Sequence, residues 1–321
     1  MSDLMKNIDA RTKLAGTNKL ELLLFSLGTD SRTGRKETFG INVFKVREVM
    51  RTPPITAAPE MPDAVEGMVS LRGHLVPVID LGKYAHVVSD EAREIMIVTE
   101  YNGHTQGFLV DAVDTILRLD WTQMKVPPEM LTARLGGLVT AVTELADGRL
   151  VMLLDVERVL SETTHFDNEH LFREIRPIGR SDALVVFADD SSVARRQVQT
   201  TLERMGVGFV AAMNGRQAWD ELQKLAGYAE SSGRPVSEVV SLVLTDIEMP
   251  ETDGYMLTKQ IKSDPRFAGI PVLMHSSLSG MSNQQLGKSV GVDEYVSKFE
   301  PQLLAATITR LLAPAPARAA A

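Results

Sequence analysis

Three carboxylates follow two apolar runs in the second half of the sequence, and their placement favours a cation site. Asp246 follows the run 241–245, and Asp189 and Asp190 follow the run 183–188. Such runs, rich in β-branched and aliphatic residues, are typical of strands buried on both faces of a parallel sheet. Because ligands of open α/β sheets gather at the carboxyl ends of strands, we expect the three acids to lie together. Grouped carboxylates repel one another unless a cation lies between them, and a hard divalent ion with oxygen ligands fits this need.

Two further polar residues end later apolar runs of the same segment. Ser276 follows residues 271–275, and Lys298 follows residues 295–297. A single aspartate at a strand end usually has no chemical role, but a carboxylate nucleophile, a divalent cation, a hydroxyl and an ammonium together are what phosphoryl transfer to a carboxylate needs. The transferred group is anionic, so catalysis consists mainly of positioning and charge neutralisation.

The elements that must position these residues alternate between strand and helix from residue 183 to residue 312. Besides the runs that precede the acids, the pattern predicts strands at 209–212, 270–274 and 294–297, and helices at 193–205, 217–225, after Gly254, near 284–290 and at 302–312. This alternation indicates a doubly wound α/β fold with a five-stranded parallel sheet. Residues 225–239 are longer than a minimal connection and are expected to form a surface excursion.

This segment resembles the response-regulator receiver domain. The positions that carry the resemblance are the acidic pair Asp189 and Asp190, the phosphoacceptor Asp246, the switch hydroxyl Ser276, the rotameric aromatic Tyr295 and the lysine Lys298. The resemblance implies phosphorylation of Asp246 to an aspartyl phosphate. It also implies Mg²⁺ bound by Asp190, Asp246 and the backbone carbonyl of Glu248, with Asp189 acting mainly through water. A small number of carboxylates is consistent with Mg²⁺, which keeps several waters.

One departure from the receiver pattern lies beside the lysine. The family usually has proline directly after it, whereas here Phe299 follows and the proline is displaced to position 301. A cis bond at this position would be lost, because a cis bond before a residue other than proline costs about 2.5–4 kcal/mol. The resemblance therefore leaves open how Lys298 is directed and how long the phosphoryl group persists.

The first half of the sequence reads as short strands joined by turns. Predicted strands and turn dipeptides are 21–27, 38–43, the run 67–81 with a turn at Arg72-Gly73, 95–98 joined to 106–110 through Asn102-Gly103, and 138–142 joined to 150–154 through Asp147-Gly148. Asn-Gly and Asp-Gly suit the tight turns of hairpins. Short strands with regular turns favour a closed or paired β-barrel architecture. Because nothing here assembles a nucleophile with a base, we expect a binding module.

This half resembles the CheW-type coupling domain, in residues 39–48, 67–81 and 107–114. The resemblance implies an all-β pair of small five-stranded barrels that links chemoreceptors to the histidine kinase CheA. By motif position, Val46, Glu48 and the Arg72-Gly73 turn would lie on the surfaces that contact receptor and kinase. A simpler alternative stays open, in which Val46 belongs to the core while Glu48 and Arg72 form a solvated ion pair.

The order of the two resemblances is that of CheV-type proteins. We expect a flexible tail (1–16), a CheW-like domain (17–162), a linker (163–181), a receiver domain (182–312) and a disordered tail (313–321). The implied protein is a chemotaxis adaptor, regulated by phosphorylation for adaptation or as a phosphate sink, and not an enzyme. The alternative from another class is a phosphatase that turns over aspartyl phosphate. A transcription factor is disfavoured because no basic helix-turn-helix follows the receiver.

Composition restricts the partners. The net charge of −8 and the lack of a basic stripe argue against nucleic acid, and the absence of cysteine excludes disulfides and thiolate metal sites. No run of about 18 apolar residues appears, so no direct membrane insertion is expected. The expected location is the cytoplasm, in association with the cytoplasmic tips of chemoreceptors in their arrays.

Overall fold

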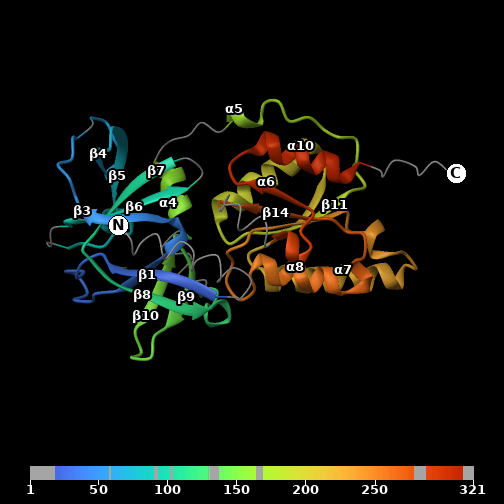
Figure 1. Ribbon diagram of the computed structural model, residues 1–321, viewed down its shortest axis with the longest axis horizontal. Coiled ribbons are helices and arrows are strands. Elements are labelled where there is room, and N and C mark those ends of the chain that lie inside the picture. Colours follow the sequence, from blue (N-terminus) through green and yellow to red (C-terminus); the bar gives the residue numbers. More distant parts are fainter. Residues whose placement is uncertain are drawn as a thin grey trace. The chain divides into compact units, whose positions relative to one another are not determined.

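The computed structural model describes residues 19–57, 59–89, 93–101, 104–128, 130, 137–163, 169–277 and 287–313. The chain forms two compact units whose main division falls between residues 166 and 167 (Figure 1). The two expected tails and the expected Asn102-Gly103 turn lie outside the described residues, apart from residue 313 of the second tail.

The first unit contains two five-stranded sheets. One has the order β8-β1-β2-β10-β9 and is built from β1 (Lys19–Ser26), β2 (Thr38–Asn42), β8 (Ala112–Asp120), β9 (Val139–Glu144) and β10 (Leu150–Leu154). The other has the order β3-β6-β7-β5-β4 and is built from β3 (Val46–Arg51), β4 (Val65–Leu71), β5 (His74–Asp80), β6 (Ile95–Tyr101) and β7 (His104–Val110). Each sheet has its own cluster of buried, mainly aliphatic side chains. These two clusters account for the short apolar runs in this half of the sequence.

Short helices complete this unit. Those that lie wholly within the described residues are the 3₁₀ turns η1 (Val43–Lys45) and η2 (Trp121–Gln123) and the helices α2 (Leu81–Tyr84) and α4 (Val156–Thr163). Asp80 accepts a hydrogen bond from the backbone of Lys83 and so begins α2 with an ordinary side-chain cap. The Arg72-Gly73 dipeptide joins β4 to β5 with φ of 51° and 84°, the left-handed backbone that a two-residue hairpin turn requires.

The second unit is a parallel five-stranded sheet in the order β12-β11-β13-β14-β15. Its strands are β11 (Leu184–Ala188), β12 (Gly208–Ala212), β13 (Leu242–Thr245), β14 (Val272–Ser276) and β15 (Glu294–Ser297), and every pair is parallel. All residues of β13 and β14 are buried, as expected for strands covered on both faces. The strand order reverses between β11 and β13, which is where ligands bind in such sheets.

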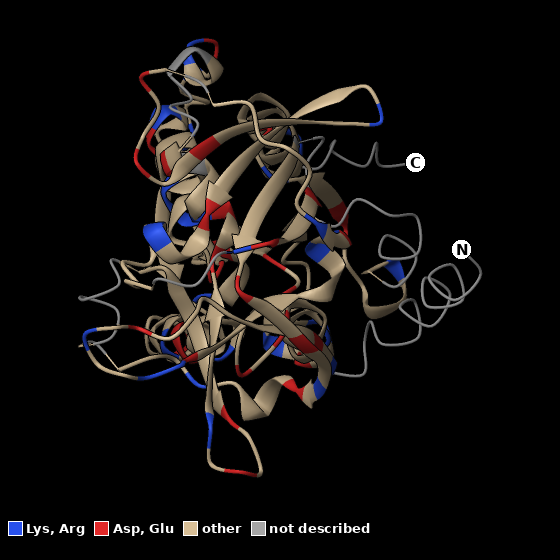
Figure 2. Cartoon of the chain, turned by 90° about the vertical axis from the view of Figure 1, so that its left-hand side faces the viewer, with Lys and Arg blue, Asp and Glu red and all other residues tan. Residues whose placement is uncertain are grey.

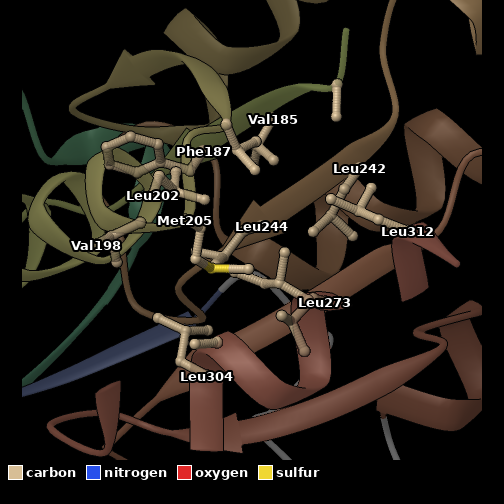
Figure 3. Packing of buried hydrophobic residues seen from close by; sticks show 14 of the residues in the cluster. Val185, Phe187, Val198, Leu202, Met205, Leu242, Leu244, Leu273, Leu304 and Leu312 are labelled. Atoms are coloured by element: carbon tan, nitrogen blue, oxygen red, sulfur yellow. The ribbon is translucent and has the colours of Figure 1, made fainter. Parts of the chain in front are cut away.

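Helices cover both faces of this sheet (Figure 1). Helices α6 (Ser192–Met205) and α10 (Pro301–Leu312) pack on one face, and α7 (Gly215–Ser231) and α8 (Gly254–Ser263) pack on the other. Figure 3 shows the first of these cores, where Phe187 and Leu244 meet Leu202 and Leu304. The 3₁₀ turns η3 (Val236–Glu238) and η4 (Pro265–Phe267) lie between the later elements. The predicted fold class is confirmed for both units.

Two segments differ from the expected boundaries. The helix expected at 217–225 extends from Gly215 to Ser231 because Ala226 and Ala229 are also buried against the sheet, so half of the expected surface excursion is helix. The segment expected to be a linker contains α5 (Glu169–Phe172), and its Phe172 and Ile175 are buried in the core of the second unit. Residues 287–290 are helical, as expected, while 284–286 lie outside the described residues.

Candidate phosphoacceptor site

Asp246 lies at the carboxyl end of β13, where the backbone leaves almost no room. Its N–H donates to the carbonyl of Ala188 at 2.9 Å, and the N–H of Ile247 lies 2.7 Å from its Oδ1. Gly254 packs against this turn so closely that a Cβ on it would lie 1.9 Å from the Asp246 carbonyl oxygen. Any other residue at 254 would push the turn outward. This packing holds Asp246 at the sheet edge, where the residue is only 4 % exposed.

Asp189 and Asp190 follow β11, the neighbouring strand. The N–H of Asp189 donates to Ala212 at 3.2 Å, which ties it to the end of β12. Arg195, in the first turns of α6, reaches back and donates from Nη1 to the carbonyl oxygens of Asp189 at 2.7 Å and Asp190 at 2.8 Å. One guanidinium thus fixes the direction of both peptide groups.

The three acids meet as their spacing predicts. One carboxylate oxygen from each of Asp189, Asp190 and Asp246 lies within 4.8 Å of the others. A set of carboxylate oxygens matches the oxygen ligands of Mg²⁺, so these residues fit the ion that the sequence implied. Glu248, whose carbonyl is a predicted ligand, lies on the same loop, two residues after Asp246.

Lys298 supplies the positive charge in this group of acids. Its Nζ lies 2.9 Å from Oδ2 of Asp189 and 2.9 Å from Oδ2 of Asp246, and the residue is only 1 % exposed. A buried ammonium between two carboxylates offsets their negative charge, because removing unpaired charges from water is costly. The predicted proximity of Lys298 and Asp246 is therefore present.

Ser276 and Tyr295 lie on the adjacent strands β14 and β15. Ser276 is buried at the end of β14, and Tyr295 pairs with Met274 in the strand register. The Ser276 hydroxyl and the Tyr295 phenol form a hydrogen bond, and burial raises the pKa of Tyr295 against the opposing effect of that bond. Burial also raises the pKa of Tyr255, and the nearby Tyr295 adds to this shift. Both phenols stay neutral at physiological pH.

Two of the residues predicted to bind partners, Glu48 and Arg72, line a hollow in the first unit. Arg72 Nη2 is 2.8 Å from Glu48 Oε2, so the hairpin turn of β4 and β5 is joined to β3 by an ion pair. The hollow has a volume of about 350 Å³ and is lined by Arg47, Glu48, Leu71, Arg72, His74, Val76, Val98, Glu100 and Thr105. Its floor includes buried valines and its rim carries charges of both signs. Val46 is half-buried at the start of β3, next to this rim.

Two contributors to the candidate phosphoacceptor site were not predicted from the sequence. Arg195 acts through carbonyls five and six residues before it, a contact that no side-chain pattern encodes. Gly254 was expected only as a helix boundary, and its close packing against the Asp246 carbonyl appears only in the structure. Positive and negative residues are interspersed over the described part of the chain (Figure 2). No helix there is long and apolar enough to cross a membrane.

Comparison with known proteins identifies both domains. Residues 21–164 match the CheW-like domain and residues 185–309 match the response regulator receiver domain. Chemotaxis protein CheW of Klebsiella aerogenes is 32% identical over 49% of this chain and 92% of its own length, and chemotaxis protein CheY1 of Helicobacter pylori is 34% identical over 37% of this chain and 89% of its own. Chemotaxis protein CheV1 of Helicobacter pylori is 27% identical over 97% of this chain and 99% of its own length.

In its domain order the chain is of the CheV type, and it is similar to CheV1 over nearly its full length. Like its relatives, this CheV-type protein carries a CheW-like coupling domain followed by a receiver domain. The acids at the ends of β11 and β13 accordingly lie in its receiver domain, and the Glu48–Arg72 pair lies in its CheW-like domain.

Proposed function

We propose that this protein is a chemotaxis adaptor that links chemoreceptors to the histidine kinase CheA and is phosphorylated on Asp246. The family match supports an adaptor. The observation that carries the phosphorylation is the Lys298 ammonium 2.9 Å from both Asp246 and Asp189, beside a third carboxylate. This is an arrangement for receiving an anionic group. The proposed location is at receptor arrays, through the CheW-like domain.

Each residue of the site has a separate role in phosphoryl transfer. An oxygen of Asp246 forms the new bond to phosphorus while the bond from phosphorus to the donor breaks and the electron pair leaves with the donor. Lys298 lies where it can contact an oxygen of the incoming group, and the Ile247 N–H holds the other side of the carboxylate. Mg²⁺, held by Asp190, Asp246 and the Glu248 carbonyl, with Asp189 acting through water, would neutralise charge on the transferred group.

Transfer from phosphorylated CheA tests the phosphoacceptor directly. Wild-type protein with Mg²⁺ should gain one acid-labile phosphoryl group per chain, and Asp246→Asn should gain none. Asp264→Asn is the matched control, because Asp264 is an aspartate of the same unit that caps η4 away from the site. Label that persists on Asp246→Asn excludes this assignment. Continued consumption of phosphodonor beyond one equivalent would favour the phosphatase alternative.

The coupling surface is tested by a pair of arginine variants. Arg72 and Arg118 are exposed to a similar degree, 67% and 59%, and each pairs with a glutamate of the first unit. We expect Arg72→Ala to weaken capture of CheA and receptor, because it removes one side of the charged rim around the hollow. Arg118→Ala should leave capture unchanged. Equal capture by both variants would favour the simpler alternative, in which Glu48 and Arg72 are only a solvated ion pair.

A further inference from the structure

Only three residues connect β15 to α10, and both ends of this connection are fixed. At its start, the N–H of Lys298 donates to the carbonyl of Ser276 at 3.2 Å, which continues the pairing of β14 with β15. At its end, Pro301 occupies the first turn of α10, and a residue before proline is kept out of the right-handed helical region. Glu300 has φ −117° and ψ 70°, which lies outside the right-handed helical region. The change of direction must therefore fall on the residue between them.

Phe299 makes this change with a left-handed backbone, at φ of 64°. Glycine adopts this conformation readily and asparagine tolerates it, whereas a bulky side chain is rarely found there. Such a conformation persists only where the surrounding structure enforces it, and such positions cluster at functional sites. Here the neighbouring residue is Lys298, whose ammonium must lie between two buried carboxylates.

We propose that the left-handed backbone of Phe299, and not its ring, directs Lys298 between Asp189 and Asp246. Phe299 is then a positioning residue for phosphoryl transfer, a role that rests on the proposed function of Asp246. It also accounts for a receiver domain that lacks the usual proline after its lysine, because a left-handed residue turns the chain at this position instead.

Four substitutions of Phe299 distinguish the effect of its backbone conformation from the effect of its ring. Phe299→Gly and Phe299→Asn remove the ring but permit the left-handed backbone, so both should be phosphorylated by phosphoramidate with Mg²⁺ at the wild-type rate. Phe299→Val disfavours that backbone through branching at Cβ, and Phe299→Pro fixes φ near −65°. Both should be slower by about tenfold to a hundredfold, since small misplacements of a catalytic group have effects of this size.

A double-mutant cycle tests whether Phe299 acts through the lysine. In a Lys298→Ala background, Phe299→Val should cause no further loss of rate, because the group that it misplaces is already gone. A general structural defect would instead slow the Lys298→Ala protein by the same factor as the wild type. Equal factors in the two backgrounds would overturn the proposal.

A readout independent of phosphorylation is the ¹⁵Nζ resonance of the Lys298 ammonium, assigned by its loss in Lys298→Ala. This resonance should persist in Phe299→Gly and Phe299→Asn and shift or disappear in Phe299→Val. Its loss from the first two variants while circular dichroism shows them folded would assign the positioning to the ring. Its persistence in folded Phe299→Val would show that the left-handed backbone is not required. Should Phe299→Val not fold, the first two variants decide alone. If wild-type protein is not phosphorylated, the proposed function is refuted. The ¹⁵Nζ measurement still tests the positioning role of Phe299, because it does not depend on phosphorylation.

Discussion

At the scale of single residues, Lys298 matters most because it is a buried cation shared by two acids. Lys298→Met should lower the free energy of unfolding by about 3–5 kcal/mol, since it leaves two carboxylates buried without a counter-charge. Mg²⁺ should restore part of this loss because it supplies the missing positive charge. Urea denaturation with and without Mg²⁺ measures both effects, followed by the fluorescence of Trp219 in a Trp121→Phe background.

The matched control is Lys262→Met in the same unit. Lys262 Nζ lies 2.7 Å from Asp293 Oδ2, but both side chains are partly exposed, so the loss should stay below about 1 kcal/mol and should not depend on Mg²⁺. Similar losses for the two variants would mean that burial does not set the strength of the Lys298 contacts.

The sequence alone predicted that Asp246, Asp189, Asp190 and Lys298 lie close together, because the carboxyl ends of parallel strands share one edge of the sheet. It did not give the left-handed conformation of Phe299, since residue type argues against that backbone and only the fixed neighbours impose it. The Glu48–Arg72 contact was one of two alternatives from the sequence, and the structure contains the ion pair without deciding whether it binds a partner.

At the scale of elements, two acidic residues, Asp155 and Glu157, are buried close together at the beginning of α4. Asp155 accepts a hydrogen bond from the Arg158 N–H at 3.1 Å, yet burial and the neighbouring Glu157 carboxylate raise the pKa of Asp155. Lys45, 3.1 Å from Glu157, opposes this shift only in part. The stability due to Asp155 is fully present below the ordinary aspartate pKa of ~3.9 and is lost as the pH rises through the raised value.

Asp155→Asn should therefore be more stable than wild type at pH 7, with the difference vanishing near pH 3. Asparagine keeps the acceptor oxygen for Arg158 and removes the charge. Urea titrations across this pH range, followed by the buried Trp121 in a Trp219→Phe background, provide the measurement.

Asp147→Asn is a control of opposite sign. Arg149 lowers the pKa of Asp147, whose contribution is present above the ordinary pKa and is lost as the pH falls through the lowered value. This variant should lose stability at pH 7. A gain for Asp147→Asn, or no pH dependence for Asp155→Asn, would contradict the electrostatic explanation.

The element types followed from periodicity, but some pairings did not. The parallel contacts of β2 with β10 and of β5 with β7 join strands far apart in the chain, and hairpin turns predict only neighbouring antiparallel pairs. The length of α7 was underestimated because its last turns carry small buried alanines, which give a weak apolar pattern.

At the scale of the whole molecule, we propose that the receiver unit begins before its first strand. Phe172 and Ile175 are buried in its core, and Arg204 lies over the Phe172 ring at 5.6 Å while donating to its carbonyl at 3.2 Å. A fragment of residues 169–313 should therefore unfold at higher urea concentration than one of residues 183–313. Burial of each side chain stabilises by about 1.5–3 kcal/mol. Equal midpoints would place the boundary at β11.

Phosphorylation of Asp246 is expected to act on the adaptor through Ser276 and Tyr295. A phosphoryl group on Asp246 adds negative charge and acceptor oxygens, and these should attract the Ser276 hydroxyl away from its hydrogen bond with Tyr295. Tyr295 would then be free to turn and alter the surface formed by β14, β15 and the helices after them. A charge-assisted hydrogen bond contributes about 1.5–3 kcal/mol, enough to shift a two-state balance by roughly tenfold to a hundredfold.

Ser276→Ala should accordingly accept phosphate on Asp246 while the affinities of its phosphorylated and unphosphorylated forms for CheA and receptor converge. Ser263→Ala, an exposed serine at the end of α8, should keep the wild-type difference. Both are measured by titrating partner against protein with and without phosphodonor. Wild-type protein that binds CheA and receptor equally with and without the phosphoryl group would contradict a switch role for Ser276. The receiver would then act as a sink that withdraws phosphate from the kinase.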